Sequence, residues 1–351
     1  MKYDRSTDGA RGWRFASGLH VRRRDLLSGL GLCAIAAALA VIALNSGEAG
    51  GGIRSLADWL RGGEMAPRLQ YALWQVRLPH LVLGFMVGWC VALAGAIMQS
   101  ITHNALADPG LFGVSQGAMT LIVVLLVFFP AAPKALIALA GLGGGLMVAV
   151  LLTALVGRHY AGGLALLLMG LAVSSVLSAV STFLLLYLPT ELSLNLAAWM
   201  EGSLFQASWT LIASFAPLLL ASIIGILTIG PALNRYQLGS ELALSLGEPV
   251  RISRPLLMAF SVLLSAASVT AVGPLMFLGI LAPHIASFLS APSGRARLFL
   301  SGCVGGCLVM AADIITKTAP GGVFLPVGLS FTLIGVPLFV VTLWVRGMRG
   351  R

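Results

Sequence analysis

Residues 81–101 read LVLGFMVGWCVALAGAIMQSI, an apolar stretch without a single charged side chain. A helix rises 1.5 Å per residue, so about 20 such residues cross the ~30 Å hydrocarbon core of a bilayer. This stretch is therefore long enough to span a membrane. Similar runs lie at 26–44, 114–130, 135–156, 164–188, 209–230, 256–272, 274–290, 298–316 and 325–345.

The composition supports a membrane fold along the whole chain. Of its 351 residues 58% are hydrophobic and 10% are charged, against about 25% charged residues in soluble domains. We predict an all-α polytopic membrane protein with about ten transmembrane helices. Its parts are a cytoplasmic segment (1–25), a transmembrane domain (26–346) and a cytoplasmic tail (347–351). The boundary at 272–274 is open, because Gly273-Pro274 could also kink a single helix.

The basic residues orient the spans. With ten spans and a cytoplasmic N-terminus, sixteen of the 22 Lys and Arg residues lie inside and six lie outside. This follows the positive-inside rule, so we expect both termini in the cytoplasm. The net charge of +10 then needs no nucleic-acid partner. Arg23-Arg24 also resembles a twin-arginine export signal, but the apolar run after it is longer than the ~7–15 residues of a signal core.

Several kinds of chemistry are not indicated. The three lysines follow Met1, Pro133 and Thr316, so the Gly-Lys-Ser/Thr core of a phosphate-binding loop does not occur. We therefore expect no ATP hydrolysis, no catalytic residue and no metal site in this chain. Asp313 is the one acidic residue within the predicted spans, which disfavours an ion-coupled carrier. Glycine pairs at Gly84/Gly88, Gly141/Gly145 and Gly302/Gly306 predict close helix packing.

Several longer blocks carry a family resemblance. They are Arg77–His80, Gly88–Gln99, Asn104–Gly117, Trp199–Leu204, Leu238–Gly247, Gly273–His284 and Leu325–Gly328. In sequence and order they closely resemble the permease subunits of ATP-binding-cassette (ABC) importers for ferric siderophores, haem and vitamin B12. The resemblance covers nearly the whole chain after residue 25. The sequence departs from the family pattern at His80, His103, Ala105 and Ser287.

The resemblance implies the type II importer permease fold in a bacterial inner membrane. It further implies a second permease copy, as a homodimer or a homologous partner, around one central pathway. Two cytoplasmic ATPase subunits would bind ATP and Mg, a periplasmic binding protein would deliver the substrate, and this chain would bind no cofactor. The expected substrate is a ferric siderophore or related iron chelate, with haem or vitamin B12 as alternatives. A self-sufficient channel or ion-coupled carrier is the rival interpretation.

Residues 237–250 form the first candidate site. They are too polar to span a membrane, and their leucine spacing followed by Gly247 and Pro249 predicts a short helix with a glycine C-cap. By resemblance this is the coupling helix that contacts the ATPase. An amphipathic helix on the membrane surface is the alternative. The candidate coupling residues are Leu238, Gly239, Glu241, Ala243, Leu246 and Gly247.

Two further sites are implied by the resemblance. A cytoplasmic gate would use Asn104 together with the turn His159-Tyr160-Ala161, which otherwise reads as a flexible loop. Docking of the binding protein would use Arg77, His80 and Lys317 near the periplasmic mouth. The alternative for these cations is that long basic side chains snorkel to the membrane interface.

Overall fold

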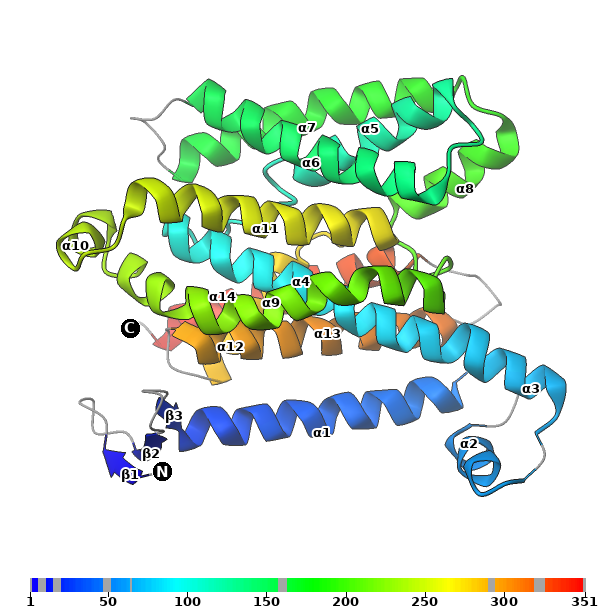
Figure 1. Ribbon diagram of the computed structural model, residues 1–351, viewed down its shortest axis with the longest axis horizontal. Coiled ribbons are helices and arrows are strands. Elements are labelled where there is room, and N and C mark those ends of the chain that lie inside the picture. The colour runs from blue at the N-terminus through cyan, green and yellow to red at the C-terminus, as the bar shows by residue number, and fades with distance from the viewer. Residues whose placement is uncertain are drawn as a thin grey trace.

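A computed structural model describes residues 2–5, 11–14, 20–46, 52–63, 65–156, 163–289, 294–318 and 326–349. Most of them belong to long helices that run side by side in one bundle (Figure 1). Ten helices coincide with the ten predicted spans. They are α1 (Arg23–Asn45), α4 (Leu78–Thr102), α5 (Val114–Phe128), α6 (Lys134–Val156), α7 (Gly163–Leu185), α9 (Trp209–Tyr236), α11 (Val250–Val272), α12 (Leu278–Leu289), α13 (Gly294–Thr318) and α14 (Val327–Arg349).

The lengths of these helices confirm a polytopic membrane protein. Within the described ranges, seven helical segments are long and apolar enough to cross a membrane. The remaining three, α5, α12 and the Val327–Val341 part of α14, are shorter apolar helices. At 1.5 Å per residue, the 12 residues of α12 extend over only about 18 Å, so α12 does not cross the hydrocarbon core by itself.

Shorter elements lie between and before the spans. Helices α2 (Ile53–Leu60) and α3 (Pro67–Tyr71) and the π-helix η1 (Ala72–Arg77) lead into α4, while α8 (Thr190–Met200) and α10 (Ser240–Ser245) flank α9. Three strands precede α1: β1 (Lys2–Arg5), β2 (Arg11–Arg14) and β3 (His20–Arg22). They form an antiparallel sheet in the order β1-β2-β3, with Trp13 opposite both Tyr3 and Val21. The sequence analysis did not predict this sheet.

The uncertain boundary near residue 273 separates two helices. α11 ends at Val272, and Gly273 adopts a φ of +79° that ends the helical path. A Cβ at Gly273 would lie 2.0 Å from the carbonyl oxygen of Trp199, so only glycine fits at this close approach. The next helix starts at Leu278 rather than at 274. The single kinked helix that the sequence left open is therefore excluded.

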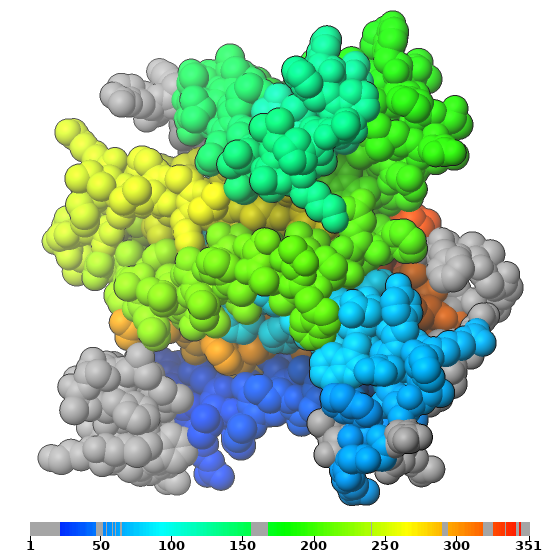
Figure 2. Space-filling model, turned by 45° about the vertical axis from the view of Figure 1, so that its right-hand side comes forward, coloured from blue at the N-terminus to red at the C-terminus, as the bar shows by residue number. Residues whose placement is uncertain are grey.

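Helix α4 runs through the middle of the bundle (Figure 1) and packs against α9, α11, α12 and α13. Within Pro67–Thr102, the helical segment that contains α4, 83% of the most apolar stretch is buried. The corresponding fraction is 11% for α1 and for α7. The glycine prediction is confirmed at Gly88, where an added Cβ would lie 2.4 Å from the carbonyl oxygen of Gly305 in α13. Helix α1, by contrast, lies along one side of the molecule against α13 (Figure 2).

The short elements gather at the two ends of the bundle. The strands β1 to β3 and helix α10 lie at one end, whereas α2, α3 and α8 lie at the opposite end (Figure 1). We call these the α10 end and the α8 end. The candidate residues divide between them in the same way, so the functional surface has two separate parts.

Candidate functional site

The local sequence explains why α10 is short. Gly239 before it has a φ of +101°, which glycine adopts readily and other residues do not. After it, Gly247 has a φ of +80°, its N–H bonds the carbonyl of Leu244 at 3.0 Å, and the N–H of Glu248 bonds the carbonyl of Ala243 at 2.9 Å. These two bonds define a Schellman C-cap. The predicted glycine cap is correct, but the helix covers 240–245 instead of 237–250.

The segment around α10, residues 238–248, exposes several leucine side chains. Four leucine side chains are 54–57% exposed: Leu238, Leu242, Leu244 and Leu246. Glu241 and Gly247 are exposed beside them. Ala243, by contrast, is fully buried against the rest of the chain. Among the candidate coupling residues, Ala243 therefore packs inward and supports the helix from behind, and its role in coupling stays a prediction.

Two side-chain contacts fix this segment to the spans on either side. Arg235, near the end of α9, donates from Nε to the buried Glu248 carboxylate at 2.6 Å. Tyr236 Oη and Ser253 Oγ are 2.8 Å apart and join the end of α9 to the start of α11. Residues 235–253 thus form one braced unit, which we call the coupling hairpin.

The connection 103–113 between α4 and α5 lies beside the coupling hairpin. Its first residue, His103, has a φ of 52°, and its ring Nε2 contacts the carbonyl oxygen of Tyr236. The predicted gate residue Asn104 follows, and its side-chain oxygen accepts a hydrogen bond from the N–H of Leu106 at 2.9 Å. The other predicted gate residues, His159, Tyr160 and Ala161, lie outside the described residues.

Asp108 in the same connection is a buried acid to which the sequence analysis gave no role. Asp108 is 3% exposed. Its carboxylate packs directly on Gly279 of α12, because a Cβ added at Gly279 would lie only 2.2 Å from Oδ1 of Asp108. Burial raises the pKa of this carboxyl group to about 7, although a backbone hydrogen bond from Gly110 opposes the shift. The Asp108-Pro-Gly110 sequence after an apolar span was the available signal.

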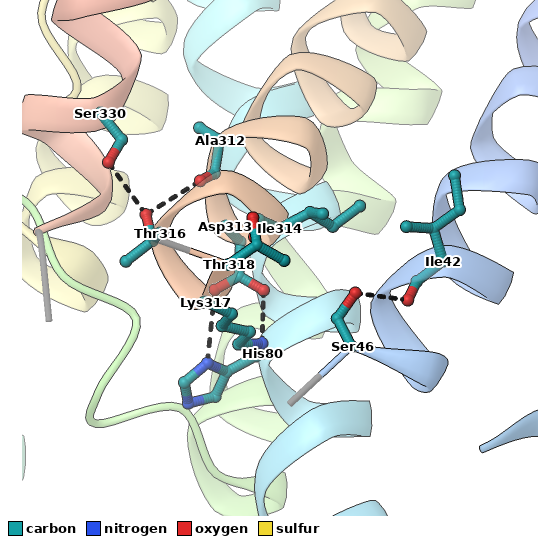
Figure 3. Close-up of polar contacts among 10 residues, drawn as sticks. All are labelled: Ile42, Ser46, His80, Ala312, Asp313, Ile314, Thr316, Lys317, Thr318 and Ser330. Atoms are coloured by element: carbon teal, nitrogen blue, oxygen red, sulfur yellow. Dashed lines mark hydrogen bonds and ion pairs between the residues drawn. The ribbon is translucent and has the colours of Figure 1, made fainter. Parts of the chain in front are cut away.

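At the α8 end, two predicted docking residues meet at one buried acid. Lys317 Nζ lies 2.5 Å from Asp313 Oδ2, and His80 Nδ1 of α4 lies 3.5 Å from Oδ1 of the same carboxylate (Figure 3). The contact between His80 and Asp313 is short enough for an ion pair, but it does not have the geometry of a hydrogen bond. The side chains of His80 and Lys317 are only 15% and 18% exposed, so both are largely enclosed by the chain.

Arg77, the third predicted docking residue, also points into the chain. It is 5% exposed, and its guanidinium donates to the carbonyl of Leu44 in the last turn of α1 at 2.6 Å. The expectation of a surface cation is therefore wrong for Arg77 in this conformation. Close to the Asp313 cluster, Thr316 donates to the hydroxyl of Ser330 at 3.1 Å and joins α13 to α14 (Figure 3). Docking at this end remains a prediction.

Among the described residues, neither part of the surface contains a group of side chains suited to bind a metal ion. Across those ranges, no three His, Cys, Asp or Glu side chains are placed to hold a metal ion. The helical bundle, the enclosed ionisable groups and the braced hairpin with exposed leucines instead define a membrane-embedded transport subunit.

The comparisons with known proteins agree with this class. The model of the FecCD transport family matches residues 29–345, and the chain belongs to this family. It is 30% identical to the iron(3+)-hydroxamate import system permease protein FhuG of Bacillus subtilis, over 80% of this chain and 86% of the relative. It is 34% identical to the vitamin B12 import system permease protein BtuC of Vibrio cholerae, over 77% and 82%.

Solved structures share the fold. A transporter described as being of the metal-chelate ABC type, in an inward-facing conformation, matches with a TM-score of 0.77 and 24% identity, over 91% of this chain and 99% of that chain. PsaBC from Streptococcus pneumoniae matches with a TM-score of 0.58 and 18% identity. The chain is thus a permease subunit of an ABC importer, a transport component and not an enzyme.

Proposed function

We propose that this permease carries a ferric siderophore or a related iron chelate from the periplasm to the cytoplasm across a bacterial inner membrane. Two copies enclose the pathway, two ATPase subunits dock at the α10 end, and a periplasmic binding protein delivers the substrate at the α8 end. ATP-driven approach of the ATPases alternates access to the pathway. ATP and Mg bind to those partners and not to this chain.

The observation that carries the proposal is the set of exposed leucines in the coupling hairpin. Four leucines within residues 238–246 are half-exposed, and exposed apolar side chains concentrated in one segment are typical of an interaction site. The contacts Arg235–Glu248 and Tyr236–Ser253 brace the hairpin. They allow it to move as one unit when an ATPase subunit displaces it. A helix that merely rests on the membrane surface needs no such bracing.

The iron-chelate assignment rests on the names of relatives. Besides FhuG, the Fe(3+)-citrate import system permease YfmE of Bacillus subtilis is 30% identical over 92% of this chain and 96% of its own length. Vitamin B12 is the second candidate substrate. It is kept because the chain is 34% identical to BtuC of Vibrio cholerae. Haem stays as an alternative from the sequence resemblance.

Reconstituted uptake tests the substrate. The permease is purified with its ATPase, placed in liposomes and supplied with its binding protein and a ferric hydroxamate, ferric citrate, haem or cyanocobalamin. We expect accumulation of a ferric chelate that requires ATP hydrolysis and is insensitive to a protonophore. Uptake of cyanocobalamin or haem alone would assign the other substrates. Protonophore-sensitive uptake without ATP would support an ion-coupled carrier and contradict the proposal.

Alanine variants test the docking surface. Leu242→Ala with Leu244→Ala removes two exposed side chains of the hairpin, and we expect the affinity for the ATPase to fall at least tenfold, since fully burying a leucine side chain contributes about 1.5–3 kcal/mol relative to leaving it exposed. The matched control is Leu220→Ala with Leu227→Ala on α9, where both leucines are 53–60% exposed in the middle of a span. Equal ATPase affinity in both double variants would exclude docking at the hairpin.

A further inference from the structure

The main-chain carbonyl of Tyr236 joins two separate parts of the chain. It accepts a hydrogen bond from the N–H of Gly239 at 3.0 Å, at the start of the coupling hairpin's turn. It also contacts the ring Nε2 of His103, a residue 133 positions earlier in the sequence. Tyr236 itself is fully buried, whereas His103 is exposed, so the junction joins a buried carbonyl to a side chain at the surface of the α10 end.

The chemistry of the contact fixes one atom of the imidazole. A carbonyl oxygen only accepts hydrogen bonds, so Nε2 of His103 must carry the proton. The neutral tautomer with hydrogen on Nε2 and the charged imidazolium both satisfy this requirement. The junction therefore needs an N–H donor of the right reach, and not a particular charge.

On one side of the junction is the braced hairpin. Arg235 and Glu248 close its base, and Tyr236 and Ser253 join the two spans that enter it. Because these contacts surround α10, a displacement of α10 also displaces the carbonyl of Tyr236.

On the other side is the connection 103–113. His103 is the C-cap of α4 with a φ of 52°, so the path of the backbone changes direction at this residue. Hydrogen bonds within the connection are local, such as those from Leu106 and Ala107 to Asn104. The ring of His103 thus connects the predicted gate segment to a distant part of the fold.

We propose that His103 is a positioning residue that transmits movement of the coupling hairpin to the connection 103–113. This inference rests on the proposed function, because it assumes that the hairpin contacts the ATPase. We assign His103 no direct contact with the ATPase or with the substrate. It acts through the carbonyl of Tyr236.

Three variants separate this role from simple support of the fold. His103→Gly removes the ring and relaxes the positive φ, so the backbone is not strained by the change. His103→Asn also tolerates a left-handed conformation, but its shorter amide falls short of the carbonyl. His103→Gln restores an N–H donor of longer reach. Thr102→Val is the matched control, because the hydroxyl of Thr102 bonds only within α4, to Met98 at 2.7 Å.

The experiment uses the full complex of permease, ATPase and binding protein in liposomes. Uptake per ATP hydrolysed is measured with the ferric chelate that the wild type carries, and hydrogen exchange is followed with and without nucleotide. For His103→Gly and His103→Asn we expect ATP hydrolysis within twofold of the wild type and uptake per ATP at least tenfold lower. Amides 240–248 should still respond to nucleotide, whereas amides 104–108 should no longer respond. His103→Gln should recover at least a third of the coupling, and Thr102→Val should match the wild type.

Wild-type uptake per ATP in both His103→Gly and His103→Asn would overturn the inference, as would an unchanged nucleotide response of amides 104–108. A complex that fails to assemble with either variant, while Thr102→Val assembles, would also overturn it and assign His103 a structural role. Failure of the proposed function looks different, because the wild-type complex would then show no ATP-dependent uptake. In that case the hydrogen-exchange response of amides 104–108 still tests whether His103 links the coupling hairpin to the connection 103–113.

Discussion

At the scale of single residues, several ionisable groups of this membrane protein are enclosed by other parts of the chain. His80 and Lys317 share Asp313, and Arg77 bonds the end of α1. The sequence predicted that these cations matter but not where they point. Lys317 and Asp313 are four residues apart in α13, whereas His80 and Leu44 come from other helices, so only the packing brings His80 to Asp313 and Leu44 to Arg77. The inward side of Ala243 was also not predicted, since a helix of six residues carries too little pattern to identify its buried side.

The Asp313 cluster gives a prediction about stability. Asp313→Asn leaves the largely enclosed ammonium group of Lys317 without a counter-charge, so we expect a loss of roughly 3 kcal/mol in the free energy of unfolding. Adding Lys317→Met removes the unpaired ammonium group and should recover most of that loss. Thermal denaturation in detergent measures both variants. A double variant as unstable as the single one would show that the charge of Lys317 is not the cause.

Asp108 predicts a dependence of stability on pH. Its pKa is raised by burial from 3.8 to about 7, so the folded chain binds more protons than the unfolded chain between these values. Stability should therefore be highest below about pH 4, fall as the pH rises towards 7 and stay constant above that, by an amount on the order of 3–5 kcal/mol. Denaturation from pH 5 to 8 should show a fall in the wild type that is absent in Asp108→Asn. Parallel curves for the two proteins would contradict this assignment.

At the scale of elements, hydrophobic run length predicted the helices well and their ends less well. Ten runs became ten helices because about 20 apolar residues without charge have few alternatives to a membrane helix. The ends depended on glycine conformations that a hydrophobic pattern does not contain. Gly239 ends the path of α9 before α10, and Gly273 delays the start of α12. The strands before α1 left no signal in the apolar pattern, because they precede the first run.

The contact between α4 and α13 yields a prediction at this scale. A methyl group at Gly88 would lie 2.4 Å from the carbonyl oxygen of Gly305, so Gly88→Ala must force the two helices apart. We expect a loss of about 1–3 kcal/mol, seen as a lower denaturation temperature. Gly31→Ala on α1 is the matched control, because nothing lies within 4 Å of a Cβ added there. Its stability should stay the same or rise slightly, as helix propensity favours alanine.

At the scale of the whole molecule, we propose that the two ends of the bundle serve different partners. The N-terminal strands and α10 lie at the same end (Figure 1), as the distribution of basic residues requires if that end faces the cytoplasm. The sequence predicted from charge alone that these elements lie on the cytoplasmic side, and the side of the membrane that this end faces stays a prediction. The sequence could not show which candidate residues meet across the bundle, because contacts such as that of His103 with Tyr236 depend on how α4 and α9 pack.

Cysteine accessibility tests the orientation. Glu241→Cys at the α10 end should react with a membrane-impermeant thiol reagent only in inverted vesicles, whereas Phe205→Cys, at a position 86% exposed near the α8 end, should react in intact spheroplasts. The exposed native Cys33 is first replaced by alanine to remove background labelling. Labelling of both sites from the same side would contradict the two-ended arrangement.

The peripheral position of α1 has a consequence for how the protein is made. Arg24 donates to the carbonyls of Phe288 and Leu289 at the end of α12, at sequence separations of 264 and 265 residues. At a synthesis rate of about 5–20 residues per second, the ribosome needs roughly 13–53 s to reach those acceptors after making α1. During that time α1 resides in lipid without α12, whose carbonyls bind Arg24, and without α13, its main packing partner. Its apolar surface is compatible with lipid, and its packing is completed only when α12 and α13 have been made and α12 binds its first turn.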